Sequence, residues 1–251
     1  MDLKNAYLDN VIAILQQSRE TQADALDEGA RLICGATLAG GNIFAFGCSH
    51  AGLLALELYY RTGGMATINP VRAPGLNLDV DPATMTSQIE RLDKYGVYIA
   101  DALPIRAGDV VIIHSVSGRN NVTVDFALRV RDKGAKVIAL TNMNTTKSQP
   151  SRHPSDLSLY QAADVVIDNG GCAGDSSTAV PGVPEKVGPT STAVGAALLN
   201  AMVVQAVGMI AASGAVPPVF ISANVEGGDA HNAAMLKKYK KNIFYMGADA
   251  E

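Results

Sequence analysis

Apolar residues recur at helical spacing at both ends of the chain and form short continuous runs in between. Residues 3–38 place Leu8 and Val11 on one apolar face, which predicts a helical arm. Residues 190–214 predict a long buried helix, and residues 230–241 predict a last amphipathic helix. The chain therefore begins and ends with helices.

The short apolar runs are bounded by glycine and polar residues, which predicts strands. These strands are expected at residues 42–46, 66–71, 109–114, 136–141 and 164–167. Helices are expected after the first three of them, at residues 53–60, 88–100 and 122–133. The segments 72–87 and 168–189 are rich in turn-forming residues and predict loops. Strand, helix and strand between residues 109 and 141 form a βαβ unit, which pairs its strands in parallel.

One α/β domain accounts for this alternation of strands and helices. We expect a single domain over residues 1–251, with its core at about 40–215, an N-terminal helical arm at 1–39 and a C-terminal helical segment at 216–251.

Composition narrows the classes of function. Of the 251 residues, 48% are hydrophobic and 18% are charged, and the net charge is −4, which disfavours nucleic acid as a partner. The three cysteines are far apart and form no CxxC pair, so we expect neither a disulfide framework nor a zinc site. The sequence gives no indication of another metal or of an organic cofactor, and we expect none. This cysteine usage fits a cytoplasmic protein. Polar residues such as Asn200 within the apolar helix favour burial over a membrane span.

Two turns that join a strand to a helix carry serine. Such turns lie where the free N–H groups and the dipole of a helix bind anions. The candidate phosphate-binding residues are Gly47, Cys48, Ser49 and His50 in the first turn, and Ser115, Ser117, Gly118 and Asn120 in the second. The serines would also suit simple helix capping, but two such turns in one sheet favour phosphate binding.

Two other phosphate-binding motifs fit the first turn less well. Gly47 and Gly52 have the separation of a Walker A loop, but Leu53 stands where that motif requires lysine. Ser49 occupies the position of the middle glycine in the dinucleotide-binding fingerprint. Both motifs are therefore disfavoured.

The segments around the two turns resemble the sugar-isomerase (SIS) domain family. The segments that carry the resemblance are Phe46–Ser49, Val110–Gly118, Gly134–Thr141 and Ala163–Ile167. The resemblance implies a three-layer αβα sandwich with a five-stranded parallel sheet and a sugar-phosphate ligand. It also implies a homodimer or homotetramer with sites near subunit boundaries. Asn120 stands where the family usually has threonine, although an amide also donates to phosphate.

Three residues resemble acid–base catalysts of particular SIS enzymes. Glu57 is similar in position to a glutamate of phosphoheptose isomerases, and His231 lies late in the chain, where such isomerases often have a histidine. Glu90 loosely resembles a glutamate of N-acetylmuramic acid 6-phosphate etherases. Each has a simpler alternative: Glu57 can pair with Arg61 at i+4, Glu90 can pair with Arg91 on the surface, and His231 can be a surface side chain.

Three functions follow as hypotheses. The first is an aldose–ketose sugar-phosphate isomerase, in which Glu57 moves a proton between adjacent carbons and His231 opens the ring. The second is a phosphosugar lyase or etherase that uses Glu90. The third is a non-catalytic sugar-phosphate sensor. Because only about 40 residues, many of them acidic, precede the first strand, we expect no DNA-binding helix-turn-helix there.

Overall fold

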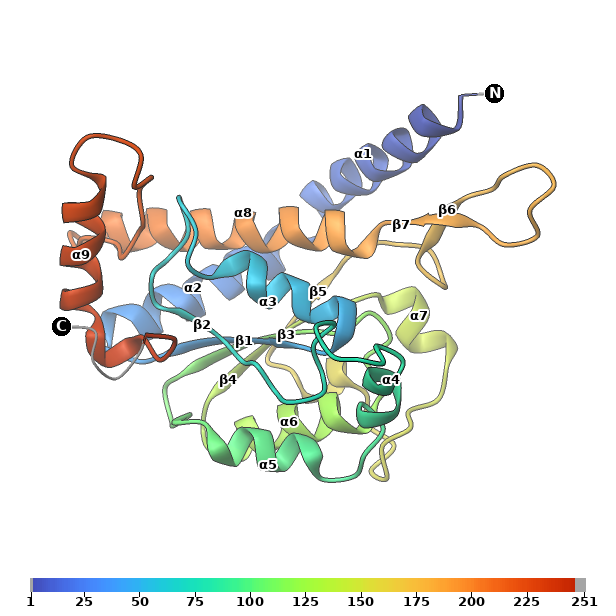
Figure 1. The fold of residues 1–251 in the computed structure, drawn as a ribbon, viewed down its shortest axis with the longest axis horizontal. Helices are drawn as coiled ribbons and strands as arrows, with labels where there is room; N and C mark the ends of the chain where they lie inside the picture. Colours follow the sequence, from blue (N-terminus) through green and yellow to red (C-terminus); the bar gives the residue numbers. More distant parts are fainter. Residues whose placement is uncertain (1, 247–251) are drawn as a thin grey trace.

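The computed structural model describes residues 2–246 and contains a five-stranded parallel sheet between two layers of helices (Figure 1). The strand order is β2-β1-β3-β4-β5. The strands are β1 (Ile43–Gly47), β2 (Ile68–Pro70), β3 (Val110–His114), β4 (Lys136–Thr141) and β5 (Val165–Asp168). The predicted three-layer α/β sandwich with a parallel sheet is confirmed.

Helices cover both faces of the sheet. One face is covered by α2 (Ala23–Leu38), α3 (Gly52–Leu58) and α8 (Ser191–Ala212). The other face is covered by α5 (Tyr95–Ala102) and α6 (Asn121–Asp132).

Alternate residues of each central strand point to opposite layers. In β1, Ile43 and Ala45 pack against α2 and α8, whereas Phe44 and Phe46 pack on the side of α6. Because both faces are covered, the strand must be apolar at every position rather than at every second one. This explains why the central strands are continuous apolar runs in the sequence.

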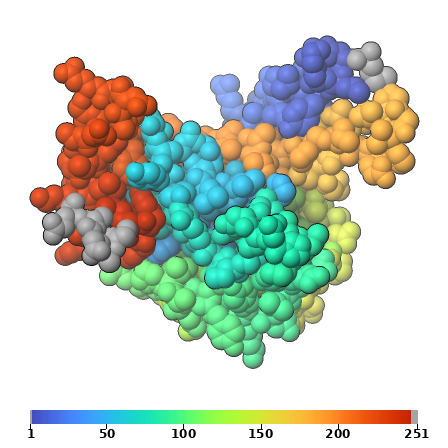
Figure 2. All heavy atoms as spheres, viewed as in Figure 1, coloured from blue at the N-terminus to red at the C-terminus, as the bar shows by residue number. Residues whose placement is uncertain are grey.

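The remaining elements lie at the two ends of the strands and at the periphery (Figure 1). Those near the carboxyl ends are α4 (Met85–Ile89), α7 (Met143–Ser148) and the hairpin of β6 (Ser176–Thr178) and β7 (Val187–Pro189). The helix α9 (Gly228–Lys238) lies toward the opposite end of the sheet. Three short 3₁₀ helices are η1 (Ser49–Ala51), η2 (Leu159–Ala162) and η3 (Lys240–Asn242). The first helix, α1 (Leu3–Thr21), projects from the body beside the hairpin (Figure 2).

Several predicted elements have different boundaries in the structure. The helical arm is two helices, because the backbone leaves the helical conformation at Gln22. The helix predicted at 88–100 is also two, α4 and α5, separated where Lys94 adopts a left-handed φ of 62° and donates its N–H to Asp125. The helix α7 and the β6–β7 hairpin lie in segments for which no element was predicted.

Neighbouring strands bring the two serine turns together. The strands β1 and β3 pair directly, and Gly47 at the end of β1 lies opposite His114 at the end of β3. The turns that follow therefore begin side by side at the carboxyl edge of the sheet. Ligands of open α/β sheets bind at this edge.

Candidate functional site

The first serine turn is held in a tight conformation. A Cβ at Gly47 would lie 2.5 Å from the carbonyl oxygen of Ala51, so only glycine fits there. Ser49 has a φ of 55°, and its N–H donates to the carbonyl of Leu76 at 2.7 Å. Its side chain is half-buried, whereas His50 is exposed. The turn is therefore a rigid backbone loop with Ser49 at its tip.

The second serine turn is fixed from both sides. Gly118 has a φ of 60°, and its N–H donates to Ser115 Oγ at 3.1 Å. Thr146 donates to the carbonyl of Ser117 at 2.8 Å, and Leu159 donates to the carbonyl of Gly118. Within residues 2–246, no protein group hydrogen-bonds the half-buried hydroxyl of Ser117, so this hydroxyl is free to bind a ligand.

Glu90 lies directly against the second turn. Its Oε2 accepts a hydrogen bond from Asn120 Nδ2 at 2.7 Å, and its backbone carbonyl accepts one from Val122 at the start of α6. Burial raises the pKa of Glu90, while the hydrogen bond from Asn120 and the charges of Arg91 and Arg152 act in the opposite direction. The simpler alternative, a surface ion pair with Arg91, is not what the structure contains: Glu90 is half-buried and bonds an amide.

Cys48 lies in the same region, and its own thiol is protonated. Its Sγ is 3.9 Å from Thr123 Oγ1. Burial raises the pKa of Cys48, and the charge of Glu90 raises it further. Because the thiolate is the nucleophilic form, Cys48 is suited to packing in the core rather than to nucleophilic attack.

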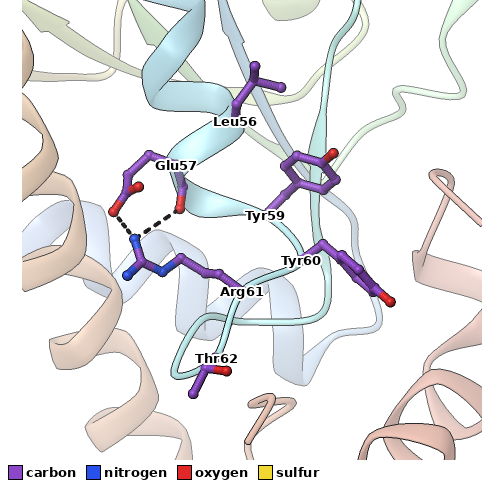
Figure 3. A pocket seen from close by; sticks show the side chains of 6 residues that line it. All are labelled: Leu56, Glu57, Tyr59, Tyr60, Arg61 and Thr62. Atoms are coloured by element: carbon purple, nitrogen blue, oxygen red, sulfur yellow. Dashed lines mark hydrogen bonds and ion pairs between the residues drawn. The ribbon is translucent and has the colours of Figure 1, made fainter. Parts of the chain in front are cut away.

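Glu57 is carried away from the serine turns by α3. At ~1.5 Å of rise per helical residue, Glu57 lies roughly 12 Å further along the helix axis than Ser49. Its carboxylate pairs with Arg61, as the alternative anticipated (Figure 3). It also accepts a hydrogen bond from Asn200 Nδ2 at 3.2 Å. The two side chains border a shallow hollow of about 410 Å³ that also includes Tyr60.

His231 also lies apart from the serine turns within one chain. Its Nε2 lies 3.0 Å from the carbonyl oxygen of Val219, in the segment just before α9. That end of the molecule faces away from α4 and α7 (Figure 1). A second hollow of about 340 Å³ is lined by other residues of α9, such as Asn232, and it shares Tyr60 and Arg61 with the hollow at Glu57. His231 does not line it. The catalytic roles of Glu57 and His231 stay predictions.

Two residues of the site region were not among the predicted ones. Arg152 donates a hydrogen bond to Asn120 Oδ1 at 2.8 Å. It lies in a loop 32 residues further along the chain, so no local sequence pattern predicts the contact. His114 is completely buried beneath the turns, and its Nδ1 is 3.1 Å from the carbonyl oxygen of Ala51. Burial lowers the pKa of His114 to about 4, so the ring is neutral at physiological pH.

Metal and membrane sites were also considered. In the described part of the chain, no three His, Cys, Asp or Glu side chains gather as a metal site would require. The helix α8 is long and apolar enough to span a bilayer, but 44% of its most apolar window is buried inside the protein. It packs against α2 in the core of one layer.

Comparison with known proteins identifies the family. The family model described as the SIS domain matches residues 6–142, which include both serine turns. The chain is also 40% identical to a UPF0309 protein of Shouchella clausii over 246 residues, covering 98% of this chain and 100% of that protein. It belongs to the SIS-domain family. Within that family it belongs to the UPF0309 proteins, and one from Oceanobacillus iheyensis is 39% identical over the same share of each chain.

Solved structures confirm the SIS fold. The chain resembles the phosphoheptose isomerase of Neisseria gonorrhoeae with a TM-score of 0.54 and 18% identity, covering 81% of this chain and 96% of that one. The phosphoheptose isomerase of Francisella tularensis gives a TM-score of 0.51 and 16% identity, over 82% and 96% of the two chains. At these identities the likeness extends to the fold alone. The reaction must be inferred from the residues of this SIS protein.

Proposed function

We propose that this SIS protein is a sugar-phosphate enzyme in which the two serine turns bind the phosphate and Glu90 transfers a proton on the sugar. The observation that carries the proposal is the hydrogen bond between Glu90 and Asn120. It joins a half-buried glutamate of raised pKa to a turn that leads into a helix N-terminus, where anions bind.

Phosphate binding rests on the position of the turns. They lie side by side at the carboxyl edge of the sheet, and the second turn leads into α6, a helix of 12 residues. The helix dipole and the hydroxyls of Ser49 and Ser117 provide favourable partners for a phosphate dianion. Gly47 and Gly118 allow the two turns their tight conformations, because a Cβ at either position would meet neighbouring atoms of the protein itself.

Proton transfer rests on the environment of Glu90. A general base works best when its pKa approaches the working pH, and burial shifts that of Glu90 in this direction. The carboxylate would remove the proton from the carbon beside the sugar carbonyl, which gives an enediolate. Return of that proton to the former carbonyl carbon, together with transfer of the hydroxyl proton to the other oxygen, completes an aldose–ketose isomerisation. A substrate with a leaving group next to that carbon would be cleaved instead, as a lyase or etherase does.

We also propose that the protein acts as a homodimer or homotetramer. The helix α1 buries only Ser18, and its apolar residues Leu8 and Ile12 are 53% and 50% exposed. A helix gains most of its stability from packing of its apolar face. We therefore expect a second copy of the chain to bury the exposed apolar face of α1.

Solvent deuterium exchange tests the assignment of Glu90. Hexose, heptose and pentose phosphates would be incubated with the protein in deuterated water and followed by proton NMR. We expect deuterium on the carbon beside the carbonyl, and a loss of at least about 100-fold in exchange for Glu90→Gln. Glu57→Gln is the comparison: if it abolishes exchange and Glu90→Gln does not, the assignment is wrong. Binding without any exchange would favour the sensor.

A further inference from the structure

Three arginine side chains gather beside the contact between Glu90 and Asn120. Arg91 follows Glu90 in the chain, Arg119 precedes Asn120, and Arg152 reaches in from the loop after α7. Burial and the positive charges of Arg119 and Arg91 lower the pKa of Arg152. Arg152 therefore lies near both of the other guanidinium groups, and each of them disfavours its positive charge.

No carboxylate forms an ion pair with these three arginines within residues 2–246. Nearby Asp125 pairs with His153 at 3.0 Å. Arg119 donates to the neutral amide of Gln149, and its Nε is buried without a protein acceptor. Glu90, the acid that lies among them, is already hydrogen-bonded to Asn120. The cluster thus has more positive charge and more donors than the protein uses.

Such a cluster fits an anion that the protein does not supply. Guanidinium groups are planar, permanently charged donors that match carboxylate and phosphate oxygens. The phosphate of the proposed substrate already has donors from the serine turns and α6. Arg119 belongs to the second turn, whereas Arg91 and Arg152 come from outside it. All three lie near Asn120 and Glu90, where we expect the rest of the ligand to extend.

We propose that the substrate is a sugar phosphate with a second anionic group, a carboxylate or a second phosphate, and that Arg152, Arg119 and Arg91 bind this group. The inference rests on the proposed function, because it assumes that the serine turns bind the first phosphate. It narrows the substrate class from sugar phosphates in general to those that carry a second anionic group.

Matched pairs of ligands test the inference by titration calorimetry. One pair is 6-phosphogluconate and sorbitol 6-phosphate, which differ in a carboxylate. The other is fructose 1,6-bisphosphate and fructose 6-phosphate, which differ in a phosphate and so distinguish the two anions. In at least one pair, we expect the member with the additional anionic group to bind the wild-type protein at least about 10-fold more tightly than the other member. A charge-assisted hydrogen bond provides a gain in affinity of this size.

The variants Arg152→Gln and Arg119→Gln should remove this preference while changing the affinity for the less acidic member by no more than about twofold. Arg31→Gln, on the exposed side of α2 where Arg31 pairs with Glu28, is the control and should keep the preference. Equal weakening of both members would mean that the arginines hold the shared phosphate, and the second-anion proposal would be wrong although the proposed function stands. A wild-type protein with no preference would also overturn it. If no phosphate ligand binds at all, the proposed function itself fails.

Discussion

The carboxyl group of Glu90 experiences opposing influences on its pKa. Burial raises the pKa, and the charge of Arg152 is one of the influences that lower it. A base acts in its ionised form, so turnover should fall as the pH drops through the raised pKa. We expect the acidic limb of the kcat–pH profile to lie above the usual range for glutamate, and to move to still higher pH in Arg152→Gln. Arg31→Gln should leave the limb in place, and a shift of the Arg152→Gln limb to lower pH would contradict the assignment.

The buried ring of His114 makes stability depend on pH. Its pKa falls from 6.5 to about 4 in the folded protein. The unfolded chain therefore takes up a proton first, and stability that is present above pH 6.5 is lost as the pH falls toward 4. The difference corresponds to ~3 kcal/mol. His114→Asn keeps a donor toward Ala51 and cannot become charged in this range.

Urea unfolding at pH 7 and pH 4.5 measures this effect. The wild type should lose more stability between the two values than His114→Asn does, whatever the stability of the variant at pH 7. Equal losses in the two proteins would show that His114 is not the group responsible.

Single residues differ in how far the sequence predicts them. The positions of Ser49 and Ser117 on turns between a strand and a helix were predictable, because strand, turn and helix are contiguous in the sequence. Their role in phosphate binding stays a prediction. The contact of Glu90 with Asn120 joins residues 30 apart, so only the resemblance to other proteins pointed to Glu90. The contact of Arg152 with Asn120 depends on how a loop folds back, and no periodicity encodes that.

Among the helices, α5 and α6 pack closely enough to require glycine. A Cβ at Gly96 would lie 2.1 Å from the carbonyl oxygen of Val122 and 2.6 Å from the N of Phe126, both of them backbone atoms of α6. Gly96→Ala should therefore cost about 3 kcal/mol in the free energy of unfolding, measured with urea. Because α6 begins at the second serine turn, ligand binding should weaken as well.

The matched control is Gly35→Ala in α2. A Cβ at Gly35 meets no atom within 4 Å, and the residue is exposed within the helix. It should leave stability unchanged or raise it by up to about 1 kcal/mol. If both variants behave alike, the close packing of α5 on α6 is not what limits stability.

The central strands and α6 were the most predictable elements. Their apolar runs are long, and Gly134 marks the turn between α6 and β4 with a φ of 82°. The elements that escaped prediction, α7 and the β6–β7 hairpin, lie in segments dominated by glycine, serine, threonine and proline. Tertiary contacts rather than local preferences stabilise such segments.

At the scale of the molecule, the projecting α1 carries the exposed apolar residues Leu8 and Ile12, which the proposed oligomer would bury. Leu8→Asp combined with Ile12→Asp should convert the proposed oligomer to monomers, because buried charges without partners are strongly unfavourable at an interface. Light scattering coupled to gel filtration measures the mass. Val216→Asp changes a residue that is 57% exposed outside α1 and should keep the oligomer intact. A monomeric wild-type protein, or an oligomer unaffected by the double substitution, would contradict the role of α1.

The central claim is that the two serine turns bind a sugar phosphate, and thermal-shift titration tests it most directly. Wild-type protein would be screened against hexose, heptose, pentose and amino-sugar phosphates, alongside Ser117→Ala and the control Ser213→Ala at the far end of α8. We predict that at least one sugar phosphate stabilises the wild type and Ser213→Ala equally, and that Ser117→Ala needs about 10-fold or more ligand for the same shift. Stabilisation that Ser117→Ala retains in full, or no stabilisation by any sugar phosphate, would contradict the claim.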